Sequence, residues 1–350
     1  MARLSASEVE AFISNLFEAL GVPRRDSAEV ATAIVAADLE GIASHGVMLL
    51  PMYVDRLRSG SVIAEAETRI VEDHGGLVIL SAEHGLGQIS SRIAVATAVE
   101  RAKIHGTATV AVRHGFHFGA ASYWTRMIAA AGMIGFAFSN TRPLMPPPGG
   151  SERVVGNNPL SIAFPSADDK PVVVDMAMSA TAMGKIRLAE ARGDEIPEGW
   201  ATDSAGNPTK SPSEAIAGML LPAAGPKGFG LAVAIDLLSG ALSGGAVGGD
   251  VRPLYGDPSV PYDCAHTFIA IDAGRLIHSV GRTVSGLADT IRGVKPAGDT
   301  PPMAPGDIER KAREASGEHV TLPKALVETL NRLAEEVGAV ARLSPSDRGE

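Results

Sequence analysis

The spacing of apolar residues predicts helices at both ends of the chain. In the first helix, apolar residues recur at steps of three and four between Val9 and Leu20, after Ser5 and Glu8 in capping-box spacing. Further helices are expected over residues 27–39, 51–58, 307–316 and 322–338. The final stretch, residues 342–350, is expected to fray.

Between these ends the pattern changes to short runs of β-branched residues that alternate irregularly with helical segments. Strands are expected over residues 68–73, 76–82, 107–114, 133–140, 160–165, 170–177 and 266–272. Helices are expected over residues 88–106, 120–131 and 229–243. This order predicts a mainly helical domain, residues 1–65 with 305–343, and a central mixed α/β domain, residues 66–304.

Composition narrows the class of protein. The 350 residues can bury a large core, and the net charge of −9, without a basic block, argues against a nucleic-acid or anionic-membrane surface. The single Cys264 excludes an internal disulfide framework and indicates a reducing compartment, with the cytoplasm as the default. The N-terminus reads as a helix and not as an export signal, and no apolar run is long enough to span a bilayer.

The segment EGIASHGVMLLPMYVDRLRSG raises the first question of chemistry. His45 follows Ser44 in a short connection between two expected helices. A hydroxyl can fix the tautomer of the neighbouring imidazole, and an imidazole with a pKa near ~6.5 can protonate an alkoxide at neutral pH. A solvated histidine at a turn is the alternative. Ser44 as a hydrolytic nucleophile has less support, because no G-x-S-x-G elbow surrounds it.

Glycines also stand where strands meet helices. Gly85 and Gly87 in HGLGQIS lack a third glycine, because Ser90 occupies that position, and Arg113 stands where an acidic ribose ligand is expected. We therefore interpret HGLGQIS as a tight strand-to-helix turn and reject an ordinary Rossmann domain. In HGFHFGAASYW, Gly119 lies at a helix start, where free N–H groups favour a pyrophosphate.

Other polar positions have a functional and a plain interpretation. Asp175 ends the buried run PVVVD, where it can contact a ribose or simply cap a turn. The loop over residues 146–165, rich in proline and glycine, can position a ligand or merely connect two elements. Lys227 in GPKGFGL can contact a ligand or be solvated. No metal site is expected, since His114 and His117 lack accompanying Asp, Glu or Cys ligands.

These signals occur in an order that resembles one family. The segments are SHGV with LPMYVDRLRSG, HGLGQ, HFGAASYW, PPGG through GNNPLSIAFP, VVVDMAMSATAMGKI, IPEGWATDSAGNPT, KGFGLAVAIDLLSG, HTFIAID and APGDIE, between about residues 5 and 340. The chain resembles the type-2 malate/L-lactate dehydrogenases, which include sulfolactate and ureidoglycolate dehydrogenases, diketogulonate reductase and cyclic-imine carboxylate reductases. The resemblance implies an α+β homodimer whose cofactor domain has a mixed, mostly antiparallel sheet in place of a Rossmann fold.

The resemblance also implies NAD- or NADP-dependent hydride transfer between nicotinamide and a 2-oxo acid or 2-hydroxy acid. His45 would act as the acid or base, with Ser44 orienting it and Lys185 as a further catalytic residue, although His117 is the alternative proton carrier. The implied cofactor-binding residues are His117, Phe118, Gly119, Ala120, Ala121, Asp175, Met176, Ala177, Gly225, Pro226, Lys227, Pro305, Gly306 and Asp307. The implied substrate-binding residues are His117, Asn140, Arg142 and Asn157.

Departures from the family concern the substrate. Leu49 stands where the family usually has an arginine that clamps the substrate carboxylate, Met183 replaces a common arginine, and Pro226 replaces a common histidine. We expect Arg142 to take over carboxylate binding. Lys185 matches the hydroxy-acid members, whereas cyclic-imine reductases have aspartate there, so a hydroxy acid is favoured. Reduction of pyrroline- or piperideine-2-carboxylate and a non-catalytic dinucleotide-binding role remain the alternatives.

Overall fold

The fold is built around one large sheet. The computed structural model describes residues 1–344, so residues 345–350 of the expected frayed tail lie outside the described part. The strands of the large sheet are β2 (Arg69–Asp73), β3 (Leu77–Ser81), β4 (Thr107–Gly115), β5 (Ile134–Ser139), β6 (Leu160–Phe164), β7 (Val172–Met176) and β10 (Cys264–Ile271). Their spatial order is β2-β3-β4-β10-β5-β6-β7.

Pairing in this sheet is mostly antiparallel. Only β3 and β4 run parallel among the described neighbours, and the helix α4 (Gly87–His105) connects them as a crossover. The long strand β10 lies between β4 and β5 and is antiparallel to both. The expected α+β class with a mixed, mostly antiparallel sheet is therefore confirmed, and so is the absence of a doubly wound parallel sheet.

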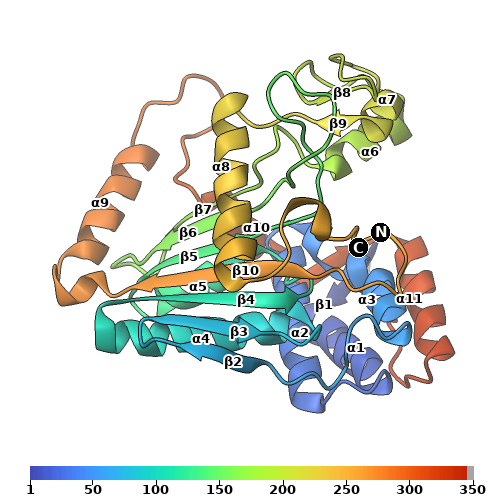
Figure 1. Ribbon diagram of the computed structural model, residues 1–350, viewed down its shortest axis with the longest axis horizontal. Helices are drawn as coiled ribbons and strands as arrows, with labels where there is room; N and C mark the ends of the chain where they lie inside the picture. Colours follow the sequence, from blue (N-terminus) through green and yellow to red (C-terminus); the bar gives the residue numbers. More distant parts are fainter. Residues whose placement is uncertain (345–350) are drawn as a thin grey trace.

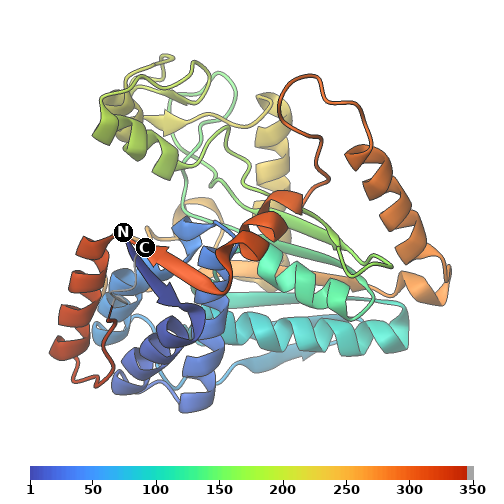
Figure 2. The same cartoon turned by 180° about the vertical axis from the view of Figure 1, so that it is seen from behind.

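Helices cover both faces of the sheet. Helix α4 and helix α5 (Ala121–Ala130) cross the face turned toward the viewer in Figure 2, where apolar side chains of both helices and of β3, β4 and β10 form one core cluster. Helix α8 (Pro226–Asp236) stands across the opposite face (Figure 1). The expected helix 229–243 thus begins earlier, at Pro226, and continues beyond Asp236 as a π-helical turn, Leu237–Ala241.

The two ends of the chain lie side by side (Figure 2). Strand β1 (Ala2–Ser5) pairs antiparallel with β11 (His319–Leu322); β1 lies beside α1 (Ala6–Ala19), and β11 lies beside both α1 and α2 (Arg24–Leu39). Neither short strand was expected from the sequence. The division into domains at residues 65 and 305 stays a prediction.

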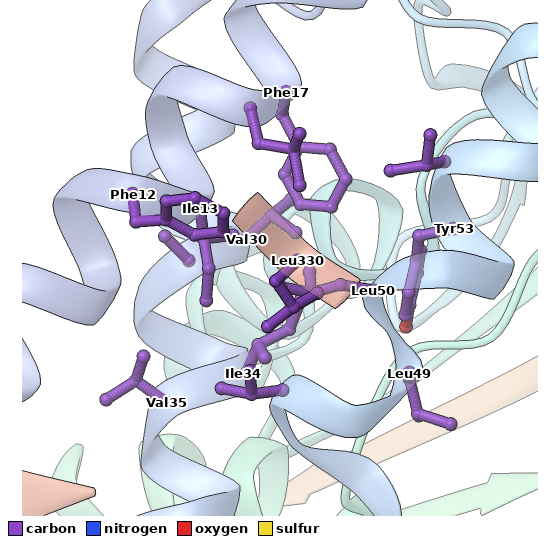
Figure 3. Packing of buried hydrophobic residues seen from close by; sticks show 14 of the residues in the cluster. Phe12, Ile13, Phe17, Val30, Ile34, Val35, Leu49, Leu50, Tyr53 and Leu330 are labelled. Carbon is purple, nitrogen blue, oxygen red and sulfur yellow. The ribbon is translucent and has the colours of Figure 1, made fainter. Parts of the chain in front are cut away.

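A second core cluster lies among the helices of these ends. Its buried side chains come mainly from α1, α2, α3 (Leu50–Arg58) and α11 (Lys324–Glu336), and they include Phe12, Ile34 and Leu330 (Figure 3). The helix α10 (Asp307–Ser316) lies beside α2. Because Leu49 and Tyr53 belong to this cluster, the segment that follows His45 is anchored in apolar packing.

A small lobe rises above the sheet in Figure 1. It contains α6 (Met183–Arg192), β8 (Ala201–Thr202), α7 (Pro212–Ala217) and β9 (Met219–Leu220), together with the proline-rich loop before β6. The helix α9 (Val280–Arg292) projects from the other end of the sheet. None of these five elements was expected from the sequence. Over residues 1–344, no helix combines the length and the apolar character needed to cross a membrane.

Candidate active site

Ser44 and His45 lie in a 3-10 turn, Ala43–His45, between α2 and α3. The Ser44 hydroxyl is 3.0 Å from Nδ1 of His45, which leaves Nε2 as the other ring nitrogen for a ligand. His45 is partly buried and Ser44 is exposed. The expected hydroxyl contact that orients His45 is therefore present in the geometry.

Asp38 and Gly46 hold this turn in place. The carboxylate of Asp38 accepts a hydrogen bond of 2.7 Å from the backbone N–H of Val47. A Cβ atom at Gly46 would overlap that carboxylate, so only glycine lets the chain pass so close. Burial raises the pKa of Asp38 to about 6, although the Val47 N–H favours the ionised form.

His117 lies beside His45. The two imidazole rings are stacked with centroids 5.5 Å apart and planes 22° from parallel. The Tyr53 hydroxyl is 2.8 Å from Nδ1 of His117, and the side-chain amide of Gln88 donates to the Tyr53 oxygen over 2.7 Å. Tyr53, itself held by Gln88, thus binds Nδ1 of His117 and leaves Nε2 as the other ring nitrogen for a ligand.

The surroundings keep His117 neutral. Burial, followed by the nearby His45 and His266, lowers the pKa of His117 to about 3. Burial also lowers the pKa of His266 to about 4 and shifts the pKa of His45 below its ordinary value. His117 is therefore an uncharged hydrogen-bonding group throughout the physiological pH range.

The start of α4 packs closely against the backbone of His117. A Cβ atom at Gly87 would overlap the carbonyl oxygens of Phe116 and His117, so glycine is required where α4 begins beneath them. His266 stacks on Phe118 with centroids 4.4 Å apart and is 3.0 Å from the Phe116 carbonyl oxygen. The motif HGLGQ therefore positions His117 in two ways: Gly87 lets the backbone come close, and Gln88 holds Tyr53, which bonds the imidazole. This role was not expected from the sequence.

Three of the four expected cofactor segments meet at the start of α5. The carboxylate of Asp175 accepts a 3.0 Å hydrogen bond from the N–H of Ser122, next to Ala121. The carbonyl oxygen of Pro305 accepts a 3.0 Å bond from the N–H of Val173, two residues before Asp175. The residues concerned are His117, Phe118, Gly119, Ala120 and Ala121, Asp175, Met176 and Ala177, and Pro305, Gly306 and Asp307.

The fourth segment, Gly225 to Lys227, begins α8 on the other face of the sheet. It connects to the end of β7 through a 2.9 Å hydrogen bond from the N–H of Ala223 to the carbonyl oxygen of Met178. Gly225 and Pro226 line a cavity of about 400 Å³ together with the proline-rich loop. Gly119 and Gly225 both have positive φ and open space where a Cβ would stand, so each presents bare backbone at a helix start.

Two expected ligand-binding residues are already engaged inside the protein. Asn140 is fully buried, and its side-chain amide bonds Asp236, the Ala246 carbonyl and the Ala265 N–H. Asp307 is buried as well, and the guanidinium groups of Arg292 and Arg310 hold its pKa well below the usual range. The side chains of Asn140 and Asp307 therefore hold the fold together and are not available to a ligand.

The remaining expected residues lie at the edge of the site. Lys185 is exposed in the first turn of α6, and the Asn157 side chain accepts a 3.0 Å hydrogen bond from Thr141. Arg142 lines a small cavity under α6. Leu49 is 4% exposed and packs in the helical core cluster, so the side chain at this position offers a ligand no charge. In residues 1–344, no group of three or more His, Cys, Asp or Glu side chains could hold a metal ion.

Comparison with known proteins identifies the family to which the chain belongs. Residues 4–331 match the model of the malate/L-lactate dehydrogenase family. The chain belongs to this family. The resemblance in the sequence is thus confirmed over almost the whole chain.

Individual relatives differ in substrate and cofactor. The chain is 35% identical to a protein of Methanocaldococcus jannaschii named L-sulfolactate dehydrogenase, over 93% of this chain and 94% of the relative. It is 34% identical to (2R)-3-sulfolactate dehydrogenase (NADP(+)) of Chromohalobacter salexigens, over 95% and 98% of the two chains. It is 37% identical to ureidoglycolate dehydrogenase (NAD(+)) of Escherichia coli O157:H7, over 73% and 72%. These names confirm, for the family, the expected nicotinamide dinucleotide.

Solved structures agree with this result. The sulfolactate dehydrogenase of Methanocaldococcus jannaschii superposes with a TM-score of 0.91 and 34% identity, covering 96% of this chain and 97% of the other. The delta1-piperideine-2-carboxylate reductase of Pseudomonas syringae superposes with a TM-score of 0.86 and 25% identity, covering 95% and 100%. One fold therefore serves both oxo-acid and cyclic-imine chemistry in these proteins.

Proposed function

We propose that the protein is an NAD- or NADP-dependent oxidoreductase that interconverts a 2-oxo acid and the corresponding 2-hydroxy acid. The observation that carries the proposal is the stacked pair of His45 and His117, each with one ring nitrogen bonded to a hydroxyl of the protein. Such a pair offers one imidazole to move a proton and a second, neutral imidazole to hold a carbonyl oxygen.

The residues present fit a dinucleotide. Gly119 and Gly225 present bare backbone next to the starts of α5 and α8, where a phosphate can come close to the main chain, and Asp175 offers an exposed carboxylate at the end of β7. We assign the cofactor to the backbone of His117 to Ala121, to Asp175 to Ala177, to Gly225 to Lys227 and to the Pro305 to Asp307 turn. When bound, the nicotinamide supplies or accepts the hydride.

We assign the proton transfer to His45. Its Nε2 forms no hydrogen bond within the described chain, and the side chain is partly exposed, so it can exchange protons with solvent. In the reductive direction, protonated His45 gives its proton to the alkoxide oxygen that forms at carbon 2. Neutral His45 takes that proton back in the oxidative direction. His117, held by Tyr53, hydrogen-bonds the same oxygen and orients it.

The substrate carboxylate requires a partner other than residue 49. We assign this contact to Arg142, and we propose that Lys185 and Asn157 complete the substrate pocket. A charge-assisted hydrogen bond is worth about 2 kcal/mol, so Arg142→Leu should lower kcat/KM about thirtyfold. An unchanged kcat/KM on the best substrate would remove Arg142 from the site.

The test is an assay of NADH and NADPH oxidation with pyruvate, oxaloacetate, 2-oxoglutarate, sulfopyruvate and cyclic imine carboxylates in parallel. We expect turnover of an oxo acid that disappears in His45→Asn and persists in His74→Asn, a matched change at an exposed histidine. Preference for the imines would favour the cyclic-imine reductase, consistent with the likeness to the piperideine carboxylate enzyme. Cofactor binding without any turnover would mean a non-catalytic dinucleotide-binding protein.

A further inference from the structure

Three arginines gather around one small cavity, and one of them is Arg142, the proposed partner of the substrate carboxylate. Arg142, Arg153 and Arg187 line a cavity of about 50 Å³, with apolar side chains and one glycine as its other walls. Arg142 and Arg153 are partly buried, and Arg187 is exposed. No acidic side chain is part of the lining.

The positive charge of this cavity is not balanced within the described chain. None of the three arginines forms an ion pair there, whereas several other arginines do, for example Arg126 with Glu40 and Arg292 with Asp307. The arginine charges interact: burial lowers the pKa of Arg142, and the charge of the neighbouring Arg153 lowers it further. Three like charges around one space are unfavourable unless an anion enters it.

Two of the arginines come from the two ends of the loop between β5 and β6 and the third comes from α6, so the fold and not a local charge run creates the cluster. Arg142 follows β5, and Arg153 lies in the loop that returns to β6. The guanidinium of Arg153 donates to the carbonyl oxygens of Ala217 and Gly218 and is thereby fixed. Arg187 reaches the cavity from α6, one helical turn after Met183, and the described chain gives it no hydrogen-bond partner.

The cavity also connects to the histidine pair. Arg142 is close enough to Tyr262 for its charge to favour the ionised phenol. The Tyr262 ring packs edge-on against Phe116, with centroids 6.0 Å apart, and Phe116 directly precedes His117. Thr141, which precedes Arg142, holds the proposed substrate residue Asn157. These contacts link Arg142 through Tyr262 to the segment that carries His117.

We propose that Arg153 and Arg187 extend the carboxylate contact assigned to Arg142 into an oxyanion subsite, which binds a second acidic group of the substrate. This inference rests on the proposed function. A sulfonate or a carboxylate has the required charge and the acceptor oxygens that guanidinium groups bind. Three guanidinium groups exceed the needs of one carboxylate, so oxo acids with two acidic groups are the preferred substrates and pyruvate is a poor one.

The decisive variant is Arg187→Gln, because Arg187 is exposed and its replacement leaves the folded contacts intact. The ratio of kcat/KM for sulfopyruvate to that for pyruvate should fall about tenfold, as expected for the loss of one charge-assisted contact. The same ratio is measured with oxaloacetate, so that sulfonate and carboxylate are compared. Arg192→Gln, an exposed arginine at the far end of α6, is the matched control and should keep the wild-type ratio.

Two results would overturn the inference. One is an unchanged ratio in Arg187→Gln, and the other is a loss confined to the KM of NADPH, which would assign the arginines to a cofactor phosphate. Calorimetric titration with inorganic sulfate gives a readout independent of turnover. If no oxo acid is turned over, the proposed function fails, while about tenfold weaker sulfate binding in Arg187→Gln still supports the arginine site. Equal sulfate binding by both proteins contradicts it.

Discussion

The two histidines of the candidate site have the same side chain in two different environments. His45 lies in a turn at the protein surface, and a neighbouring serine hydroxyl is its bonded partner. His117 is held through Tyr53 and Gln88, which come from two other helices. The hydrogen-bond partner of His45 is its neighbour in the chain, whereas the partners that hold His117 reach it only in the assembled fold.

The two environments give the two histidines different protonation behaviour. Burial and two neighbouring imidazoles lower the pKa of His117 to about 3, so it stays neutral, while burial alone lowers the pKa of His45. Two titratable groups whose surroundings differ can take different roles in one reaction. The contrast therefore favours proton transfer by His45 and hydrogen bonding by His117.

The largest expected effect is at His45. His45→Asn should lower kcat about a thousandfold, because a positioned acid or base contributes about 10²–10⁴ to rate. In the wild type, reduction should slow as pH rises through the pKa of His45, since the imidazolium is the proton donor, and oxidation should slow as pH falls below it. The measurement is kcat against pH in both directions. A wild-type pH profile that survives in His45→Asn would assign the titration to another group.

Gly46→Ala tests whether the His45 turn depends on close packing. The added Cβ would overlap the Asp38 carboxylate and break its bond to Val47, at a cost of about 3 kcal/mol. We expect a lower melting temperature and a lower kcat, because the turn that carries His45 shifts. Gly286→Ala on α9, where a Cβ meets no atom within 4 Å, is the control: it should leave kcat unchanged and raise the melting temperature slightly, because alanine favours a helix interior over glycine.

The sequence predicted the strands of the large sheet and most of the helices, and it missed the pair β1 and β11, the elements of the small lobe and α9. The helix α4 was expected to within a residue at each end, because it lies between two β-branched runs and Gly106 follows it. The pair β1 and β11 was missed, since each strand has four residues and its partner lies at the opposite end of the chain. Hydrogen bonds between segments so distant leave no local period to read.

The same limit applies to the candidate site. Family resemblance indicated Ser44 and His45, which are adjacent in the chain, and named the cofactor segments. Nothing in the sequence pattern indicated that Tyr53 bonds His117, 64 residues away, or that Arg153 and Arg187 share a cavity with Arg142. Asn140 also looked available in sequence, although its amide is fully engaged in the fold.

Tyr53→Phe tests the environment of His117. The change removes the hydroxyl between His117 and Gln88 and leaves the Gln88 amide buried without its partner, which costs about 2 kcal/mol of stability. We also expect kcat to fall, because the orientation of His117 is no longer fixed. Thermal unfolding and steady-state kinetics measure the two effects. Tyr123→Phe, at a partly buried tyrosine with no hydrogen bond within the described chain, should behave like the wild type.

The smallest effect is a pH dependence of stability at Asp38. Its folded-state pKa of about 6 lies above the ordinary 3.8, so the stability that the protonated carboxyl contributes is fully present below pH 3.8 and is lost as pH rises through 6. Asp38→Asn keeps an acceptor for the Val47 N–H without the charge. The variant should therefore gain about 1–2 kcal/mol over the wild type between pH 4 and pH 7, read from unfolding curves at each pH. His117 responds in the opposite sense, because a neutral imidazole with a depressed pKa loses stability as pH falls. If the gain in free energy of unfolding of Asp38→Asn over the wild type stays constant with pH, the turn carrying His45 does not bury a charge.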